Sequence, residues 1–598
     1  MNYCQSPYQY QRRLSREVRV GKVGVGGTNP VRVQSMITCD TMDTAASIQQ
    51  TLDLVAVGCE IVRITAPTVK DSANLQHIVA GLRERGCEVP IVADIHFKPD
   101  AAMEAAKWVE KVRINPGNYA DSKKFKIVEY TDEQYAAELE RIRERFTPLV
   151  VFMKAHGRAM RIGTNHGSLS DRIMNRYGDT PLGMVESALE FARIARDLGY
   201  HDFMFSMKSS NPKVMIEAYR LLVARLDEES KAPDSFDLRP STLDLWNYPI
   251  HLGVTEAGDG EDGRIKSAIG IGSLLNDGIG DTIRVSLTED SVHEIPVAQA
   301  LVRNVAPGSI ALAEDAPLSY DPFSYRRRVT ESLEVGGVRV GGEETIRVFT
   351  TQEKWDALAH KLDRLGDYRP EATIEACGVV AVDPRDETLI NGINDGPLPQ
   401  LVTVADGLDL PVIAAFRLLA ARLDERHPIV LKDTLHPAAD AKTDFQDTLL
   451  TAAKRIGSLL CDGIGDAVLV QGEEAPGQSL RLAYNTLQAA GSRIFKTDYV
   501  ACPSCGRTLF NLQTTTAKIK AATAHLKGVK IAIMGCIVNG PGEMADADFG
   551  YVGGAPGKVN LYVGKTPVKF NIPETEAVDR LQDLIREHGK WVDAPVAA

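Results

Sequence analysis

Short apolar runs and amphipathic helical stretches alternate through the first 290 residues, and this alternation restricts the fold more than any other feature. In the helical stretches apolar residues recur at steps of three and four, and several begin with Asp, Pro or Thr and end near Gly. Strands that alternate with helices form parallel sheets. The expected strands are VRVQS (31–35), EIVRIT (60–65), PIVADI (90–95), KVRIN (111–115), AMRIG (159–163), FMFSMK (203–208), PIHLGVTE (249–256) and DTIRVSL (281–287). The expected helices include Ala45–Gly58, Asp71–Arg85, Glu133–Arg145, Pro181–Leu198, Lys213–Glu228 and Arg264–Asp277.

Eight strand–helix units within about 260 residues predict a closed (β/α)₈ barrel, the TIM barrel, in an α/β protein. An open doubly wound sheet is the alternative, but no G-x-G-x-x-G follows the first strand to support a dinucleotide site in such a sheet. The fifth strand has a competing candidate, because PLVVFMKAHG (148–157) is a further apolar run directly before AMRIG.

The middle of the chain, about 291–490, repeats parts of this first region. IGSLLNDGIGD (271–281) recurs as IGSLLCDGIGD (456–466) with ten of eleven residues identical, and IEAYRLLVARLDE (216–228) recurs as IAAFRLLAARLDE (413–425). Two long matches in the same order favour a duplication of part of the barrel over convergent helix packing.

The copy lacks the polar residues that end the strands of the first region. In the aligned segments Leu435 stands in the place of Glu256, and Leu469 stands in the place of Arg284. We therefore expect a barrel-like inserted domain without catalytic residues.

Polar and charged side chains stand at the ends of the predicted barrel strands, where such barrels carry their chemistry. Five cations that converge on one mouth repel one another unless an anion binds, and the forked donors of arginine suit phosphate oxygens. The alternative is that each arginine pairs with a carboxylate lower in the barrel. In a chain of net charge −12 the pattern favours a site for a diphosphate or a phosphosugar. Its candidate residues are Arg63, Asp94, His96, Arg113, Asn115, Arg161, Asn165, Lys208, Glu256, Arg284 and Ser286.

Two of these candidates could move protons. Glu256 is an acid among cations, which suits a general acid or base and equally suits a counter-ion for the arginines. His96 follows an apolar strand, where a histidine is more often structural than catalytic.

Three cysteines cluster in the last part of the chain, 491–598, which we expect to be a small α+β domain. Cys502 and Cys505 form a C-x₂-C pair, and Cys536 follows 31 residues later. A fourth ligand must come from another residue type, a distant cysteine or a substrate. Glu543 is well placed, because it directly follows a Gly-Pro-Gly turn.

The cysteine spacing leaves three interpretations open. An iron–sulfur cluster would take the thiolates and leave one iron accessible through a weak oxygen ligand. Structural zinc would take four closed ligands, and His525 could be the fourth. A thiol redox pair is the third, although the C-x-x-C does not begin a helix within a clear βαβ unit. Spacing ranks the cluster first and zinc second.

Composition narrows the cellular setting. Nine cysteines in a large acidic chain argue for a reducing compartment rather than a disulfide framework. The first residues lack the apolar core of a secretory signal, and no window approaches the roughly 18 apolar residues of a membrane span. An acidic surface disfavours nucleic-acid and membrane binding. A cytoplasmic protein is expected.

The motifs in this sequence resemble the 4-hydroxy-3-methylbut-2-enyl diphosphate synthase (IspG/GcpE) family. The matching segments are VRVQSM, EIVRITAPT, PIVADIHF, VRINPGN, RIGTNHGSL, GVTEAG, KSAIGIGSLLNDGIGDTIRVSL, ACPSCGR and GCIVNGPGE. They cover the first and last regions, and the chain resembles the long, three-domain form known in plants and some bacteria. The resemblance therefore implies a catalytic TIM barrel (1–290), the insert (291–490) and a cluster domain (491–598). One local departure is His166, where members often have Ala between Asn165 and Gly167.

The resemblance implies a function and a set of site residues. The enzyme would reductively open 2-C-methyl-D-erythritol 2,4-cyclodiphosphate and remove a hydroxyl as water, in the methylerythritol phosphate route to isoprenoids. A [4Fe–4S] cluster would be held by Cys502, Cys505, Cys536 and Glu543. The diphosphate would be held by Arg63, Arg113, Arg161, Lys208, Arg284 and Ser286. Asp94, His96, Asn115 and Asn165 would line the same mouth, and Glu256 would act near the departing hydroxyl.

The resemblance also concerns partners. A ferredoxin or flavodoxin would donate electrons, since the chain shows no flavin or nicotinamide motif. In compact members the cluster domain covers the barrel of a partner subunit, so a homodimer is one alternative. The insert could instead let the barrel and the cluster domain of a single chain meet. The rival function is a zinc-bearing, phosphate-binding barrel, a lyase or synthase without redox chemistry.

Overall fold

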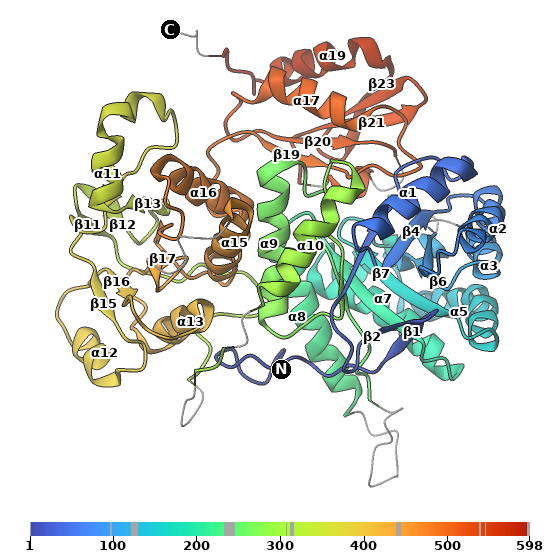
Figure 1. Ribbon diagram of the computed structural model, residues 1–598, viewed down its shortest axis with the longest axis horizontal. Coiled ribbons are helices and arrows are strands. Elements are labelled where there is room, and N and C mark those ends of the chain that lie inside the picture. Colours follow the sequence, from blue (N-terminus) through green and yellow to red (C-terminus); the bar gives the residue numbers. More distant parts are fainter. Residues whose placement is uncertain are drawn as a thin grey trace.

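The computed structural model describes residues 2–95, 98–120, 129–231, 245–305, 308–310, 316–437, 444–537, 540–544 and 546–594. They form three parts (Figure 1): a barrel in blue to green, an insert in yellow to brown beside it, and a C-terminal domain in orange to red above the barrel.

Eight parallel strands form the barrel, in the order β8-β7-β6-β5-β4-β3-β10-β9, and a parallel bridge from Phe205 to Ile250 brings its two ends together. This confirms the TIM barrel, and the doubly wound alternative is wrong. The strands are β3 (Arg32–Met36), β4 (Ile61–Thr65), β5 (Ile91–Asp94), β6 (Lys111–Ile114), β7 (Ala159–Asn165), β8 (Phe203–Lys208), β9 (His251–Leu252) and β10 (Thr282–Ile283).

The helices of the barrel follow their strands closely. They are α1 (Thr44–Ala56), α2 (Val69–Glu84), α3 (Pro99–Ala106), α4 (Pro116–Tyr119), α5 (Asp132–Ala155), α6 (Asp171–Tyr177), α7 (Pro181–Asp197), α8 (Pro212–Glu229), α9 (Gly260–Asn276) and α10 (Glu294–Arg303), which follows the short η1 (Ser291–His293). Capping boxes at Thr68 and Thr131 start α2 and α5. The competing run 148–157 lies largely in α5, which continues through Pro148, so AMRIG is the fifth strand.

An N-terminal hairpin closes the bottom of the barrel. Its strands are β1 (Val18–Val20) and β2 (Val23–Val25), and their valines pack against Ile61, Val92 and Met204 from the barrel strands. Because apolar side chains fill this end, the polar residues of the strands gather at the opposite, carboxyl-terminal end.

The insert resembles a smaller barrel. Its parallel strands are ordered β14-β13-β18-β17 and β15-β16, and a parallel bridge from Val402 to Ile429 connects the two groups. The strands are β13 (Arg347–Thr350), β14 (Ala372–Thr373), β15 (Val380–Val382), β16 (Val402–Val404), β17 (Val430–Lys432) and β18 (Ala467–Leu469). The helices are α11 (Gln352–Leu358), η2 (Ala359–Arg364), α12 (Glu387–Asn394), α13 (Val412–Arg422), α15 (Phe445–Cys461) and α16 (Pro476–Ala489). A hairpin, β11 (Leu333–Val335) and β12 (Val338–Val340), precedes them as β1–β2 precedes the barrel.

The repeated segments form the contact between barrel and insert. Arg220 on α8 bonds to Asp277 (2.9 Å) and Asp462 (2.7 Å), and Arg417 on α13 bonds to the same Asp462 (2.9 Å) and Asp277 (2.8 Å). All four side chains are buried. Each arginine thus bonds to the aspartate of its own copy and to the equivalent aspartate of the other copy, a near-symmetric pattern that a duplication would produce.

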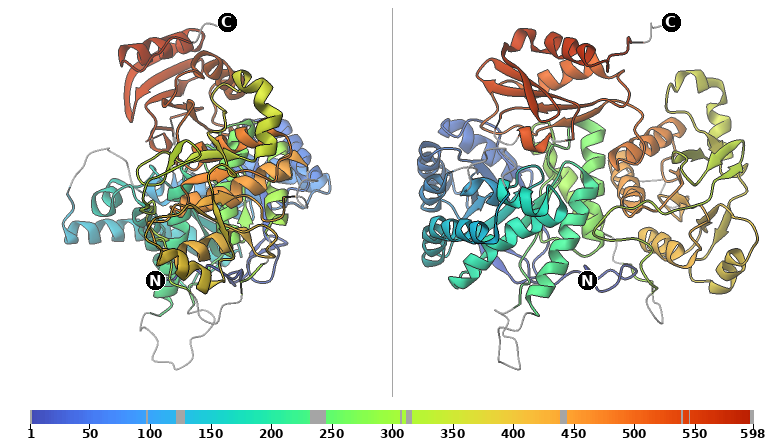
Figure 2. Two further views of the ribbon diagram at one scale, coloured as in Figure 1. Left: turned by 90° about the vertical axis from the view of Figure 1, so that its left-hand side faces the viewer. Right: turned by 180° about the vertical axis from the view of Figure 1, so that it is seen from behind.

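The C-terminal domain is a five-stranded sheet with its two longer helices on one face (Figures 1 and 2). Its strands are β19 (Asp498–Ala501), β20 (Lys530–Met534), β21 (Phe549–Ala555), β22 (Lys558–Val563) and β23 (Thr566–Pro573). Its helices are α17 (Leu512–Thr523), α18 (Gly540–Glu543) and α19 (Glu574–Glu587). A parallel bridge from Ala501 to Ala257 ties β19 to the barrel mouth. Within the described residues, every helix is too short or too polar to cross a membrane.

Candidate active site

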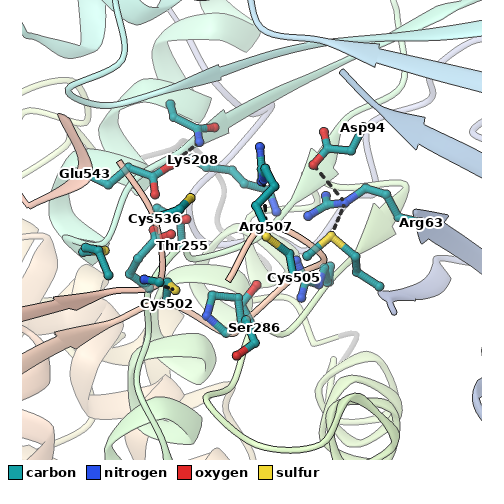
Figure 3. A pocket seen from close by; sticks show the side chains of 18 of the residues that line it. Arg63, Asp94, Lys208, Thr255, Ser286, Cys502, Cys505, Arg507, Cys536 and Glu543 are labelled. Atoms are coloured by element: carbon teal, nitrogen blue, oxygen red, sulfur yellow. Dashed lines mark hydrogen bonds and ion pairs between the residues drawn. The ribbon is translucent and has the colours of Figure 1, made fainter. Parts of the chain in front are cut away.

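A pocket lies between the barrel mouth and the C-terminal domain (Figure 3). Most of the predicted site residues line it: Arg63, Asp94, Arg113, Arg161, Asn165, Lys208, Glu256, Arg284 and Ser286 from the barrel, with Cys502, Cys505, Cys536 and Glu543 from the C-terminal domain. One chain therefore brings together two sets of residues that are up to about 480 positions apart in the sequence.

Two predicted residues are not in this lining. Asn115 caps α4, where its side chain accepts a hydrogen bond from Gly117 N at 3.2 Å, so its direct role here is structural. His96 lies outside the described residues.

Carboxylates neutralise only part of the positive charge at the mouth. Asp94 forms ion pairs with both Arg63 (3.6 Å) and Arg113 (3.1 Å), and Glu294 forms one with Arg284 (3.3 Å). Within the part of the chain that the structure describes, Arg161 and Lys208 have no ion-pair partner, and Arg161 donates to Ser206 Oγ at 2.8 Å. Three of the four arginines thus pair with a carboxylate, but two of them share Asp94, and the remaining positive charge suits an anion.

The pKa values of the buried cations reflect this excess of positive charge. Burial, and then the neighbouring Arg63 and Arg161, hold the pKa of Lys208 well below its ordinary 10.5. Burial likewise lowers the pKa of Arg63 to about 10, although Asp94 opposes the shift. Gly253 provides space for Lys208, since a Cβ there would lie 2.7 Å from Nζ. A bound anion would reverse both shifts.

Glu256 is held in a strained and buried place. Its φ is 48°, which is uncommon for a residue with a side chain, and strain of this kind is often found at functional sites. Burial and the adjacent Glu543 carboxylate raise the pKa of Glu256 well above 4.5. Its Oε2 is buried without a hydrogen-bond partner among the described residues. Burial and the neighbouring Glu543 both favour the protonated form of this carboxyl over the ionised form.

Hydrogen bonds help to position Cys502 and Glu543. Gly535 N donates to Cys502 Sγ at 3.3 Å, and Asn165 Nδ2 on the barrel donates to Glu543 Oε1 at 2.5 Å. The described residues include no group of three or more Cys, His, Asp or Glu closed around a single metal ion. His525, the candidate zinc ligand, instead packs edge-on against Trp591 with ring centroids 5.1 Å apart.

Glycines and ion pairs close the C-terminal domain over the barrel. The backbones of Gly167 and Gly542 touch, and a Cβ on Gly542 would lie 2.3 Å from Gly167 O. Lys266 pairs with Asp498 at 3.0 Å, which links α9 to β19. The pocket is therefore covered by the chain's own C-terminal domain.

Sequence reasoning missed some of the lining, including Met36, Thr255, Arg507 and Met534. Arg507 is the most notable, because its Nε donates to Cys505 Sγ at 3.3 Å. Burial lowers its pKa, but the cysteine thiolates and Asp94 outweigh this and raise it above the ordinary value. Its signal was its position two residues after the second cysteine of the C-x₂-C pair.

The comparisons with known proteins match one and the same family from the first region of the chain to the last. The model of the GcpE TIM-barrel domain matches residues 15–299, and that of the GcpE protein C-terminal domain matches residues 498–587. A 4-hydroxy-3-methylbut-2-en-1-yl diphosphate synthase (flavodoxin) from Akkermansia muciniphila is 59% identical over 597 residues, which is 99% of each chain. The enzyme of the same name from Chlorobaculum tepidum is 43% identical, over 99% of this chain and 91% of that one. The chloroplastic ferredoxin-type enzyme of Arabidopsis thaliana is 41% identical, over 100% of this chain and 90% of that one.

Solved structures add little. Dihydropteroate synthase from Burkholderia cenocepacia matches with 15% identity and a TM-score of 0.29, over 48% of this chain and 95% of that chain. A score this low carries no argument about function.

Proposed function

The chain belongs to the GcpE family, and we propose that its pocket converts 2-C-methyl-D-erythritol 2,4-cyclodiphosphate to 4-hydroxy-3-methylbut-2-enyl diphosphate. Full-length relatives carry the name of this synthase, in flavodoxin and ferredoxin forms. The reaction consumes two electrons and two protons, breaks two C–O bonds, one of which opens the ring, and releases water. The observation that carries the proposal is that a cation-lined mouth and three thiols with a carboxylate share one pocket.

The residues present fit a [4Fe–4S] cluster better than a single zinc ion. Cys502, Cys505, Cys536 and Glu543 line one pocket but are not arranged around a single-ion site, and a four-iron cluster needs ligands that are spread apart. These four residues would hold the cluster. When bound, it would supply electrons one at a time, which side chains cannot do.

The barrel would hold the diphosphate. Lys208 and Arg161 have no carboxylate partner among the described residues, so phosphate oxygens would provide the charge that they lack. Arg63, Arg113 and Arg284 are fixed in place by Asp94 and Glu294, which leaves their remaining donors for the same anion. Ser286 and Asn165 complete the polar lining.

Glu256 would supply a proton to the departing hydroxyl. Its buried position favours the protonated carboxyl, and it lies beside Glu543 at the side of the pocket that faces the cluster ligands. A protonated acid makes water the leaving group in place of hydroxide.

Electrons would come from a flavodoxin or a ferredoxin, as the names of the relatives indicate for those enzymes. Because the pocket is complete within one chain, we propose that a barrel-dead and a cluster-dead chain do not complement each other. Full activity of a mixture of the two would contradict this. A reducing cytoplasm would keep the three ligand cysteines free of disulfide bonds.

Anaerobic purification tests the proposed function. A brown protein with iron and sulfide that consumes the cyclodiphosphate in the presence of a reductant supports it. A colourless protein with one zinc per chain that remains active would instead support the rival lyase or synthase.

A further inference from the structure

Arg507 occupies a place that neither the barrel residues nor the four cluster ligands explain. Figure 3 shows it in the middle of the pocket, between Cys505 and the residues of the barrel mouth. Its Nε donates to Cys505 Sγ at 3.3 Å, and its Nη1 is buried with no hydrogen-bond partner among the described residues.

The loop that carries Arg507 is firmly seated. Cys505 N donates to Thr508 Oγ1 at 3.1 Å, and Thr508 N donates back to Cys505 O at 2.9 Å. Gly506 lies against the barrel, where a Cβ would approach Cys39 O to 2.7 Å and Thr65 Oγ1 to 2.9 Å. The guanidinium therefore keeps a fixed place when the two domains are closed.

A fixed positive charge beside a cluster ligand favours the reduced cluster. Reduction adds negative charge to the iron and sulfur atoms, and hydrogen bonds and charges near the sulfurs set the potential of such clusters. Arginine keeps its charge at any working pH, and a charge-assisted bond is stronger in a buried site than in water.

We propose that Arg507 is a redox-tuning residue, whose charge-assisted hydrogen bond to Cys505 raises the reduction potential of the cluster. The unpartnered Nη1 then gives the same guanidinium a donor for a substrate oxygen. This inference rests on the proposed function, because it requires a cluster at the four ligands.

The test compares Arg507→Met with the parent chain. Methionine matches much of the length of arginine without its charge or donors. We expect the variant to keep iron and sulfide and to show a more negative midpoint potential in a redox titration followed by electron paramagnetic resonance. A tenfold change in the reduction equilibrium is 59 mV for a one-electron couple, and we expect a shift of about that size. The Michaelis constant for the cyclodiphosphate should also rise.

Two further variants keep the test decisive. Arg507→Gln retains donors without charge and should shift the potential nearly as far as methionine does. Arg507→Lys retains charge on a shorter group that cannot keep the Nε contact, so its potential should fall between that of the parent and that of Arg507→Met. If both neutral variants lose iron, the midpoint potential of Arg507→Lys is the deciding measurement. A midpoint of Arg507→Lys equal to that of the parent overturns the inference.

The matched control is Arg580→Met, which removes an exposed arginine on α19 that pairs with Glu576. It should leave the potential unchanged. Equal midpoints in iron-loaded parent and Arg507 variants overturn this inference alone. A parent chain without iron or sulfide overturns the proposed function itself.

Discussion

Replacing Lys208 by methionine should stabilise the free protein and weaken its binding of phosphate. The change thus lowers the free energy of the folded chain but makes the free energy of binding less favourable. Lys208 is 5% exposed, has no ion-pair partner among the described residues and lies near several arginines. The effective penalty for an unpaired buried ion is several kcal/mol. Even about 1 kcal/mol of relief raises the melting temperature by roughly 2–4 °C in a domain of this size.

The binding loss has its own magnitude. A hydrogen bond to a charged group contributes about 1.5–3 kcal/mol, so the dissociation constant for inorganic pyrophosphate should rise roughly 10- to 150-fold. Thermal melts and calorimetric titrations of the purified chain, with and without pyrophosphate, measure both effects. A destabilised variant that binds pyrophosphate as tightly as the parent would refute the reasoning.

Lys111 provides the matched control. It is fully buried, and burial with the nearby Arg161 and Arg63 lowers its pKa well below 10.5. It does not line the pocket, and its Nζ lies 3.6 Å from Met204 Sδ. Lys111→Met should therefore raise the melting temperature while most of the pyrophosphate affinity remains.

The pH dependence of the Lys208→Met effect follows from the depressed pKa. The folded chain binds fewer protons at this position than the unfolded chain does, between the lowered pKa and 10.5. The stability of the parent therefore rises with pH across that window. The advantage of Lys208→Met should accordingly shrink as the pH approaches 10.5, and an advantage that grows with pH would contradict the assignment.

Four further outcomes follow. Arg417→Met leaves both aspartates of the barrel–insert network with one arginine, so stability should fall by about 3–5 kcal/mol; an unchanged melting temperature contradicts this. Gly542→Ala places a Cβ 2.3 Å from Gly167 O, so kcat/KM should fall about 100-fold with the cluster retained, and normal turnover argues against closure. The raised pKa of Glu256 keeps its acid form to higher pH, so kcat/KM should decline as pH rises through that pKa, a limb that Glu256→Gln should abolish. Glu543→Ala should make the cluster labile while the barrel still folds, and normal turnover with an intact cluster removes Glu543 from the ligand set.

The barrel could be predicted from the sequence because its strands end in polar residues and its helices carry clear periodicity. The run 148–157 was ambiguous, since a short apolar segment suits a strand or a buried helix equally well, and only packing placed it in α5. Asn115 shows a different limit. An asparagine after a strand suits a ligand or a helix cap, and here it caps α4.

The C-terminal domain shows what the sequence could not indicate. The spacing of Cys502, Cys505 and Cys536 predicted a shared site, but zinc through His525 stayed open until the fold placed that histidine beside Trp591. Arg507 was overlooked because its position after the C-x₂-C pair does not reveal that its Nε donates a hydrogen bond to Cys505 Sγ. The closing contact of Gly167 with Gly542 likewise depends on two domains meeting in space.

The most direct test of the central claim is iron and acid-labile sulfide per chain in anaerobically purified protein, read together with the spectrum of its reduced form. The account predicts about four irons and four sulfides per chain, with loss of both and of turnover in Cys536→Ala. Full conversion of the cyclodiphosphate by a chain that contains no iron would contradict it.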